Sequence, residues 1–259
     1  MKRNDQNLLE DFGRCIEKVS NLIEEIDPCI IIYPIKGAVP IADLLRIINP
    51  SISGRYNEYI PTSSTIVDTN QVIYGWFRNF IEEEHVVGEE QSIITIDEVV
   101  SGSSIVRASK QIRRAINDYG RTKCITNEDL CKEIVYHSIA IKDKRNERDG
   151  KGLNNGYLKI RNIGFVKEVD VEENLVMDKP DLCPLRLVRI PEHRFGKNLP
   201  VMDTYCINQE YLNFLNRFAS FFGQDLSVVD LQNPEKIRQS ERFLPEKYKS
   251  LENYLSTKQ

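Results

Sequence analysis

The sequence predicts an α/β protein with a mainly parallel sheet flanked by helices. Short apolar runs at 29–33, 93–96 and 134–141 have the length of single buried strands. Apolar residues at helical spacing fill stretches between these runs, so that strands and helices alternate along the chain. The chain has 259 residues, and 41% of them are hydrophobic, which is enough for a substantial core.

The first 48 residues predict a helix, a strand and a second helix. Apolar residues recur at helical spacing from Leu8 to Ile26, and Asp27-Pro28 ends this pattern. A strand over 29–33 follows, and a turn at 34–38 leads into a helix that reaches Ile48. We expect the first helix to cover the sheet.

The middle of the chain continues the alternation. Residues 51–60 are ambiguous and compatible with a strand, and the polar run at 61–65 predicts a loop. Apolar residues from Ile73 to Ile81 then indicate an amphipathic helix. The run IITIDEVV at 93–100 predicts a buried strand, and a further helical pattern begins after SGSS and ends at Gly120.

Beyond residue 133 the pattern changes. A strand at 134–141 is followed by an exposed charged loop, and 158–169 with 171–177 could form a hairpin or meander. Apolar stripes predict helices over 211–222 and 244–255, whereas 178–207 lacks a clear period. We therefore divide the chain into an N-terminal helix (1–27), an α/β core (28–150) and a hairpin and helical C-terminal extension (151–259). The extension is expected to form a hood, an oligomer contact or a partner surface.

Composition excludes several classes of protein. The net charge of −4 gives no general attraction to nucleic acid. The six cysteines form no CxxC pair, and Cys15 and Cys29 lie in or near apolar patterns that would bury them as reduced thiols. The first residues lack a signal-peptide core, and nowhere do about 18 apolar residues run together. We expect a cytoplasmic protein without a membrane segment.

The stretch from Ile93 to Ser104 carries the clearest functional signal. Asp97 and Glu98 follow the apolar run, and the residues from Ser101 to Ser104 are small. Such a loop lets several backbone N–H groups point into one concavity at a helix start, where the helix dipole also favours an anion. Ligands of open α/β sheets bind at such strand ends. Without a ligand, the same residues would be an exposed strand end and a helix N-cap.

Two junctions together resemble the type I phosphoribosyltransferases. IIIYPIKGAVPIADLL at 30–45 is similar to the family's pyrophosphate loop, in which a strand leads through Lys or Arg, Gly and a small residue into a helix. IITIDEVVSGSS is similar to its signature for phosphoribosyl pyrophosphate. Both occur in the family's order, about 60 residues apart, and the resemblance covers roughly residues 28–145.

The resemblance implies a type I phosphoribosyltransferase-like fold and a set of roles. Lys36 and the N–H groups of Gly37 and Ala38 would meet pyrophosphate together with Mg²⁺ held mainly by the substrate's own oxygens. Asp97 and Glu98 would accept hydrogen bonds from the ribose hydroxyls. The 5′-phosphate would bind to the loop of Ser101, Gly102, Ser103 and Ser104. We predict no metal ligands from the protein itself.

Acceptor recognition is less defined. IAIKDKR at 139–145 looks like a strand and lysine that meet a purine base, which nominates Lys142 for substrate binding. Arg55, Tyr56 and Tyr74 are weaker candidates between the two motifs. Each could equally be an exposed or packed side chain. We expect a small-molecule phosphoribosyl substrate and a homodimer.

Two hypotheses of different kinds follow. The first is an Mg²⁺-dependent enzyme that transfers the phosphoribosyl group to a base or an unusual acceptor and releases pyrophosphate. The second is an inactive protein of the same fold that senses a phosphoribosyl compound or nucleotide and contacts a protein partner through 151–259. The loop favours the second hypothesis because it has one residue fewer than the family pattern between Glu98 and Ser101.

Other readings of the motifs and histidines are weaker. The acidic strand end could belong to a P-loop ATPase, but no GxxxxGK[ST] sequence occurs. The three histidines are too scattered in the sequence to suggest a metal site or a catalytic triad, and His137 is expected to be packed and neutral.

Overall fold

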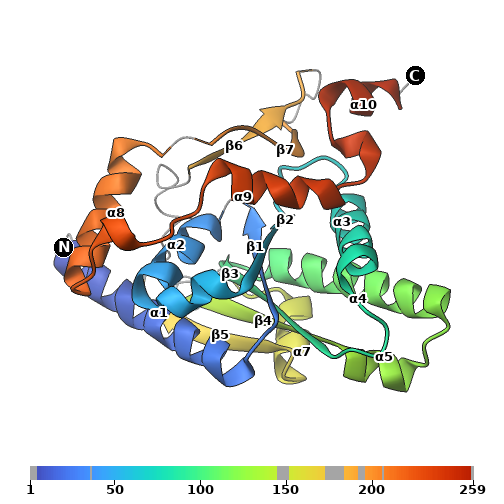
Figure 1. Ribbon diagram of the computed structural model, residues 1–259, viewed down its shortest axis with the longest axis horizontal. Helices are drawn as coiled ribbons and strands as arrows, with labels where there is room; N and C mark the ends of the chain where they lie inside the picture. Colours follow the sequence, from blue (N-terminus) through green and yellow to red (C-terminus); the bar gives the residue numbers. More distant parts are fainter. Residues whose placement is uncertain are drawn as a thin grey trace.

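The computed structural model describes residues 5–35, 37–144, 152–172, 184–191, 196–205 and 207–257 (Figure 1). Its central sheet has five strands in the spatial order β2-β1-β3-β4-β5, and each neighbouring pair is parallel. The strands are β1 (Ile30–Ile35), β2 (Tyr56–Pro61), β3 (Gln91–Val99), β4 (Ile134–Asp143) and β5 (Val166–Val171). The predicted α/β class with a parallel sheet flanked by helices is confirmed.

The strand order reverses between β1 and β3. From β1 the chain moves outward to β2, and it then returns past β1 to add β3, β4 and β5 on the other side. In doubly wound sheets the loops that follow the two strands at such a point separate, and a crevice opens at their carboxyl ends. The order therefore marks one place on the sheet as the expected ligand site.

Helices cover both faces of the sheet. α3 (Thr69–Glu84), α4 (Ser103–Lys123) and α7 (Asn155–Asn162) follow the strand connections on one face, where α4 contacts both others. α2 (Val39–Ile48) lies on the opposite face with α1 (Asp5–Ile26), which also contacts β5 (Figure 1). The short helix α5 (Asn127–Glu133) precedes β4. The first helix thus covers the sheet as predicted.

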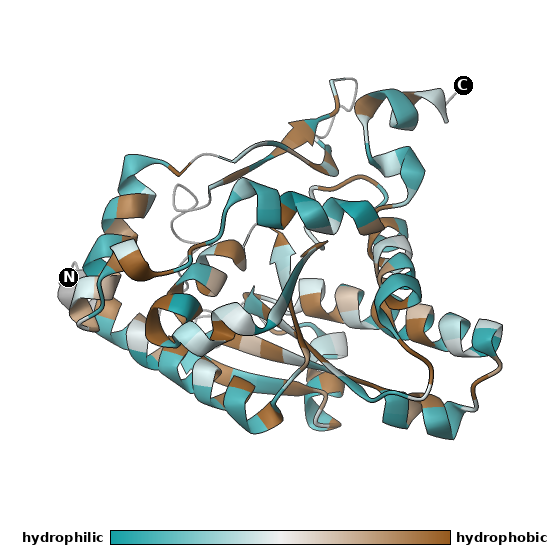
Figure 2. Cartoon of the chain, in the orientation of Figure 1, coloured by the Kyte–Doolittle hydropathy of each residue, from teal (hydrophilic) through white to brown (hydrophobic). Residues whose placement is uncertain are grey.

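The apolar pattern of the sequence accounts for this core. All six residues of β1 are buried, as are Ile93 to Ile96 of β3, because helices lie on both faces. Figure 2 colours the central strands mostly hydrophobic and the outward sides of the helices mostly hydrophilic. Phe12, Ile16 and Val19 of α1 are buried at the spacing that the sequence predicts.

The C-terminal part consists of a hairpin, helices and short turns. β6 (Leu185–Arg189) and β7 (Asn198–Tyr205) form the antiparallel pair. The helices are α8 (Gln209–Phe221), α9 (Pro234–Gln239) and α10 (Leu251–Ser256), with single 3₁₀ turns η3 (Leu226–Val228), η4 (Ser240–Phe243) and η5 (Glu246–Tyr248); another, η1 (Pro50–Gly54), precedes β2. A hairpin and helices after the core are therefore present.

Part of the predicted C-terminal pattern is wrong. Residues 158–162 belong to α7, and 166–171 form a parallel strand of the main sheet instead of one arm of a hairpin. Asn154 caps the helix, and Gly164 ends it with a φ of +74°, so the helix is too short for its period to show. The sheet extends past residue 150, into the segment expected as an extension; residues 173–177 lie outside the described residues.

Two smaller predictions also need correction. Cys29 is exposed, because the buried part of β1 begins one residue later, whereas Cys15 is buried as predicted. The apolar stripe over 244–255 is not one helix: Pro245 precedes the turn η5, and Ser250 then caps a separate helix, α10. Within the described residues no helix combines the length and apolar character needed to cross a bilayer.

The C-terminal segment is tied to α2 by buried polar contacts. The hydroxyl of Tyr211 donates to Oδ2 of Asp43, and the backbone N–H of Gln232 donates to Oδ1 at 2.7 Å. Asp43 is fully buried, and this burial raises its pKa to about 6 although both hydrogen bonds and Arg46 lower it. Because both oxygens are satisfied, the contact fixes the segment on the core.

The same segment covers the edge of the sheet. Ser240 accepts a hydrogen bond from the N–H of Tyr59 on the edge strand β2 at 2.9 Å. The Ser240 carbonyl accepts from the indole of Trp76 on α3 at 2.8 Å, and the ring of Phe243 packs edge-on against that indole. An edge covered in this way cannot pair with a strand from another chain.

Candidate functional site

The two sequence motifs meet at the point where the strand order reverses. β1 leads into the loop that contains Gly37, and its neighbour β3 ends two residues beyond Asp97. A Cβ placed on Gly37 would lie 3.7 Å from Oδ1 of Asp97. Residues that are 60 positions apart in the sequence are therefore in van der Waals range at the carboxyl end of the sheet.

Asp97 has an unusual environment for a carboxylate. Burial, together with the nearby charge of Glu98, raises its pKa to about 8, while a hydrogen bond from the backbone N–H of Glu98 lowers it. No side chain in the described ranges donates a hydrogen bond to it. A half-buried carboxylate with so few partners is a feature of sites that complete their hydrogen bonding with a ligand.

Glu98 lies on the other side of the sheet. Successive residues of a strand project to opposite faces, and both Asp97 and Glu98 lie inside β3. Glu98 is buried toward α1, which carries Cys15. The pKa of Cys15 is raised to about 12, chiefly by burial and in smaller part by the charge of carboxylates that include Glu98. The charge of Glu98 thus acts on the neighbouring Asp97, but the side chain of Glu98 leaves the strand on the face opposite Gly37.

The loop of Ser101 to Ser104 forms the predicted tight turn into α4. Gly102 has a φ of +75° and no side chain caps the helix there. The hydroxyl of Ser101 donates to Oγ of Ser103 at 3.0 Å and accepts from the Ser103 N–H at 3.4 Å. The first amides of a helix have no acceptors within it, so this turn can bind an anion.

Helix α7 closes one side of this loop. The N–H of Asn154 donates to the carbonyl of Ser101 at 2.8 Å, and its side chain lies 3.5 Å from Oγ of Ser103. A Cβ on Gly102 would lie 2.4 Å from the ring of Tyr157, whose hydroxyl donates to Glu168 at 2.8 Å. Sequence reasoning missed Asn154 and Tyr157; the helix-capping Asn before Gly156 was the available signal.

Lys142 lies on the same face of the sheet as Asp97. The register pairs Lys142 with Val99, two residues beyond Asp97 on β3. Its ammonium lies 3.5 Å from Glu168 and 3.5 Å from Asp170, and the side chain is 8% exposed. Lys142 is therefore near the site, and carboxylates of β5 hold it there.

The pyrophosphate loop is described only in part. Lys36 lies outside the described residues. The N–H of Ala38 donates to the carbonyl of Pro34 at 3.1 Å, so this amide already has an acceptor. Ala38 is buried and begins α2 without a side-chain cap, whereas Gly37 faces Asp97.

The weaker candidates between the motifs lie elsewhere. Arg55 and Tyr56 stand at the start of β2, and in a parallel sheet this is the edge opposite the carboxyl ends of the strands. The hydroxyl of Tyr74 donates to Asp118 on α4 at 2.9 Å. Burial lowers the pKa of His137, which fits the neutral histidine expected there.

The described residues contain no group of three or more His, Cys, Asp or Glu placed to hold a metal ion. A cation at this site would accordingly need oxygens from a ligand as well as from the protein. This is how Mg²⁺ is usually bound beside phosphates.

Comparisons with known proteins reveal only remote likenesses. No protein-family model matches the chain, and no curated protein does either. Among solved structures, the chain is similar to tagatose-6-phosphate ketose/aldose isomerase from Escherichia coli, with a TM-score of 0.32 and 12% identity over 63% of this chain and 38% of that one. It is also similar to the HGPRT-ase from Leishmania tarentolae in complex with GMP, with a TM-score of 0.28 and 12% identity over 54% of this chain and 69% of that one. Likenesses this remote leave the function to be inferred from the site.

Proposed function

We propose that the chain is an Mg²⁺-dependent phosphoribosyltransferase that uses phosphoribosyl pyrophosphate as its donor. One observation carries this proposal. The reversal of strand order brings the loop of Gly37 against Asp97 and places the loop of Ser101 to Ser104 directly after the same strand. A pyrophosphate loop, a ribose carboxylate and a 5′-phosphate loop would then share one crevice.

The reaction sets the charges that such a site must stabilise. The bond from the anomeric carbon to a pyrophosphate oxygen breaks, and its electron pair leaves with pyrophosphate while an acceptor atom bonds to the carbon. Positive charge grows on the ribose ring, and negative charge grows on the leaving group. Catalysis requires groups that interact more strongly with these charges than with the ground state.

The residues of the site have distinct parts in this mechanism. Asp97 would accept a hydrogen bond from a ribose hydroxyl and place negative charge below the ring. The Gly37 backbone and Lys36 would meet the pyrophosphate, and the turn from Ser101 to Ser104 would bind the 5′-phosphate. Glu98 would add negative potential from the opposite face of the sheet. Lys142, at the end of the adjacent strand β4, would contact the acceptor.

The donor set fits a magnesium ion held largely by substrate. Asp97 is a carboxylate without a side-chain partner in the described ranges, which suits a hard cation that keeps most of its ligands from phosphate oxygens and water. When bound, Mg²⁺ neutralises charge on the pyrophosphate. The positive charge would also favour the ionised form of Asp97, whose pKa is raised in the free protein.

Turnover of the donor tests this function directly. The protein would be incubated with phosphoribosyl pyrophosphate, Mg²⁺ and a panel of bases, and the release of pyrophosphate measured. Asp97→Asn should reduce release by about 100-fold or more, whereas Glu90→Gln, which changes an exposed residue before β3, should keep it. Absence of release with every acceptor, together with absence of calorimetric binding of the donor, would show that the ligand is wrong.

A second function is favoured by the covering of the phosphate loop. Asn154 and Tyr157 hold the loop from one side, and the loop has one residue fewer than the family pattern. A loop fixed in this way could bind a phosphoribosyl compound or nucleotide without the movement that turnover needs, and act as a sensor for a protein partner. Tight binding of phosphoribosyl pyrophosphate with no pyrophosphate release from any acceptor would establish this second function over the first.

A further inference from the structure

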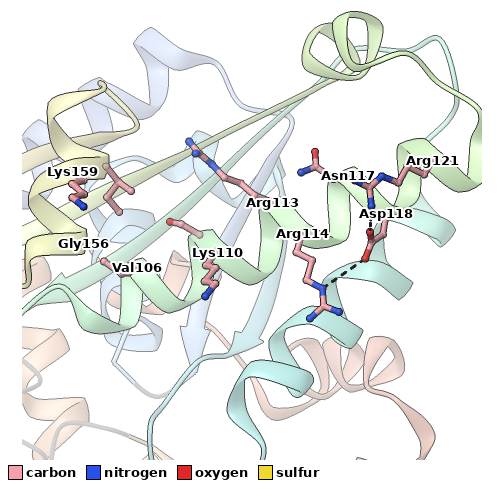
Figure 3. Close-up of a pocket in the computed structure, with 11 residues that line it drawn as sticks. Val106, Lys110, Arg113, Arg114, Asn117, Asp118, Arg121, Gly156 and Lys159 are labelled. Atoms are coloured by element: carbon pink, nitrogen blue, oxygen red, sulfur yellow. Dashed lines mark hydrogen bonds and ion pairs between the residues drawn. The ribbon is translucent and has the colours of Figure 1, made fainter.

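A hollow in the surface begins beside the loop of Ser101 to Ser104 and extends along α4 away from it. It has a volume of about 670 Å³ and runs between α4 and α7, from Val106 and Gly156 toward Arg121 (Figure 3). Ser109, one of its lining residues, is seven positions beyond Gly102, which corresponds to about 10 Å along a helix. We call this hollow the α4–α7 groove.

The charge of the α4–α7 groove is opposite to that of the whole chain. Five cationic side chains line it against one carboxylate, that of Asp118, whereas the chain carries a net charge of −4. Asp118 is shared between Arg114 at 3.8 Å and Arg121 at 3.5 Å (Figure 3). Lys110 and Lys159 form no ion pair with any residue that the structure describes. The groove therefore keeps an excess of positive charge that the described carboxylates do not balance.

Arg113 is held where it can face a ligand. Its guanidinium lies over the ring of Phe165, with 3.9 Å between the guanidinium carbon and the ring centroid. Figure 3 shows the side chain extending from α4 toward α7, which carries Lys159. A stacked guanidinium loses little entropy on binding an anion, because its position is already fixed.

The floor of the groove differs from its rim. Val106 and Ile160 contribute apolar surface, and Gly156 lets the two helices approach, since a Cβ there would lie 3.1 Å from Val106. Ser109 also lines the groove and is 2% exposed, and its hydroxyl has no hydrogen-bond partner among the described residues. A buried hydroxyl without a partner costs free energy unless a ligand supplies one.

We propose that the α4–α7 groove binds a phosphorylated small molecule with an apolar or aromatic body, of the size of a nucleotide. Its phosphates would lie among Lys110, Arg113 and Lys159, and its body would cover the apolar floor and bond to the hydroxyl of Ser109. The volume is within the range of small-molecule sites. A nucleic-acid duplex would contact the cations through its phosphates, and it would leave the floor and the buried hydroxyl without a role.

Calorimetric titration with ATP, GTP, CTP and UTP at constant ionic strength tests this site. Three control ligands are titrated in the same way. Inorganic tripolyphosphate has the phosphate charge without the apolar body, and adenosine has the body without the phosphates. A single-stranded DNA dodecamer tests whether any polyanion binds. We expect at least one nucleotide to bind more tightly than all three. Binding of tripolyphosphate or DNA as tight as that of every nucleotide, or no nucleotide binding at about 1 mM, would overturn the proposal.

Paired variants locate the binding. Lys110→Gln/Lys159→Gln should weaken the bound nucleotide at least tenfold, whereas Lys18→Gln/Lys123→Gln, with the same loss of charge at exposed positions outside the groove, should change affinity less than twofold. Ser109→Ala should weaken binding severalfold without lowering the melting temperature of the free protein, since it removes an unpartnered hydroxyl. Equal effects of the two lysine pairs would overturn the assignment to this groove.

Discussion

Two aspartates with raised pKa values occupy very different surroundings. Asp43 lies in the junction between α2 and the C-terminal segment, where Tyr211 and Gln232 satisfy both of its oxygens. Asp97 lies at the end of β3, where no side chain of the described residues donates to it, and its pKa is raised further. The fold satisfies both oxygens of the first carboxylate, whereas we propose that a ligand completes the second. Burial alone therefore does not show whether the fold satisfies a carboxylate.

The largest effect should follow removal of the structural aspartate. Asp43→Ala would remove the carboxylate that accepts hydrogen bonds from two buried donors, the hydroxyl of Tyr211 and the N–H of Gln232. Hydrogen bonds to a charged group contribute about 1.5–3 kcal/mol each, so we expect a loss of about 3 kcal/mol or more in the free energy of unfolding. Urea denaturation measures it, with the exposed Asp203→Ala as control, which should change stability by no more than about 0.5 kcal/mol. Similar midpoints for the two variants would contradict the structural role of Asp43.

Asp97, which we propose binds the ribose, should show the reverse behaviour. Asp97→Asn is expected to reduce pyrophosphate release by about 100-fold or more, the size of effect seen when one electrostatic contact to a transition state is removed. It should not lower the free energy of unfolding, because the fold supplies no side-chain partner to lose. Steady-state kinetics and urea denaturation of the same preparation separate the two effects. An Asp97→Asn protein that is destabilised like Asp43→Ala would abolish the distinction between the aspartates.

Two glycines with the same backbone angle test the closure of the phosphate loop. Gly102 and Gly164 have φ values of +75° and +74°, but a Cβ meets the Tyr157 ring only at Gly102, and it meets nothing within 4 Å at Gly164. Gly164→Ala should cost about 1–2 kcal/mol from backbone strain. Gly102→Ala should cost more and also weaken donor binding, because it displaces Tyr157. Equal losses in denaturation would show that α7 does not press on the loop.

The last test concerns how stability depends on pH. The folded pKa of Asp97, about 8, is above its ordinary value of 3.8, so its contribution to stability is full below pH 3.8 and is lost as pH rises through 8. Asp43, with a folded pKa of about 6, loses its contribution at lower pH. Between pH 6 and 8, the melting temperature of Asp97→Asn should therefore rise relative to that of the unmodified protein. A constant difference between the two melting curves would contradict the raised pKa.

The sequence was sufficient to predict the elements whose apolar pattern is long or strong. The helix up to Ile26 and the buried strands before Gly37 and at Asp97 are long or strongly apolar, and the structure has them where predicted. The short helix α7 was missed because eight residues show little period, and a parallel strand after it was taken for a hairpin arm. Local pattern does not tell which strand a segment will pair with.

The residues of the candidate site also differ in whether the sequence alone could predict them. Gly37, Asp97 and the loop of Ser101 to Ser104 could be predicted because their backbone chemistry is local, and the structure brings these segments to one end of the sheet. Tyr157 could not be predicted, since its contact with Gly102 depends on where α7 packs. The roles of Glu98 and Lys142 stay predictions. Strand alternation sends Glu98 toward α1, and carboxylates of β5 surround Lys142.

The covered edge of β2 has a consequence for synthesis. The groups that complete Asp43 and Tyr59 come from residues 189 and 181 positions later in the chain. While a ribosome still holds those residues, the carboxylate of Asp43 lacks both of its protein donors and the sheet has an open edge. We therefore expect the N-terminal half to reach its final packing only after the C-terminal half has been released, and the nascent sheet to be open to aggregation until then.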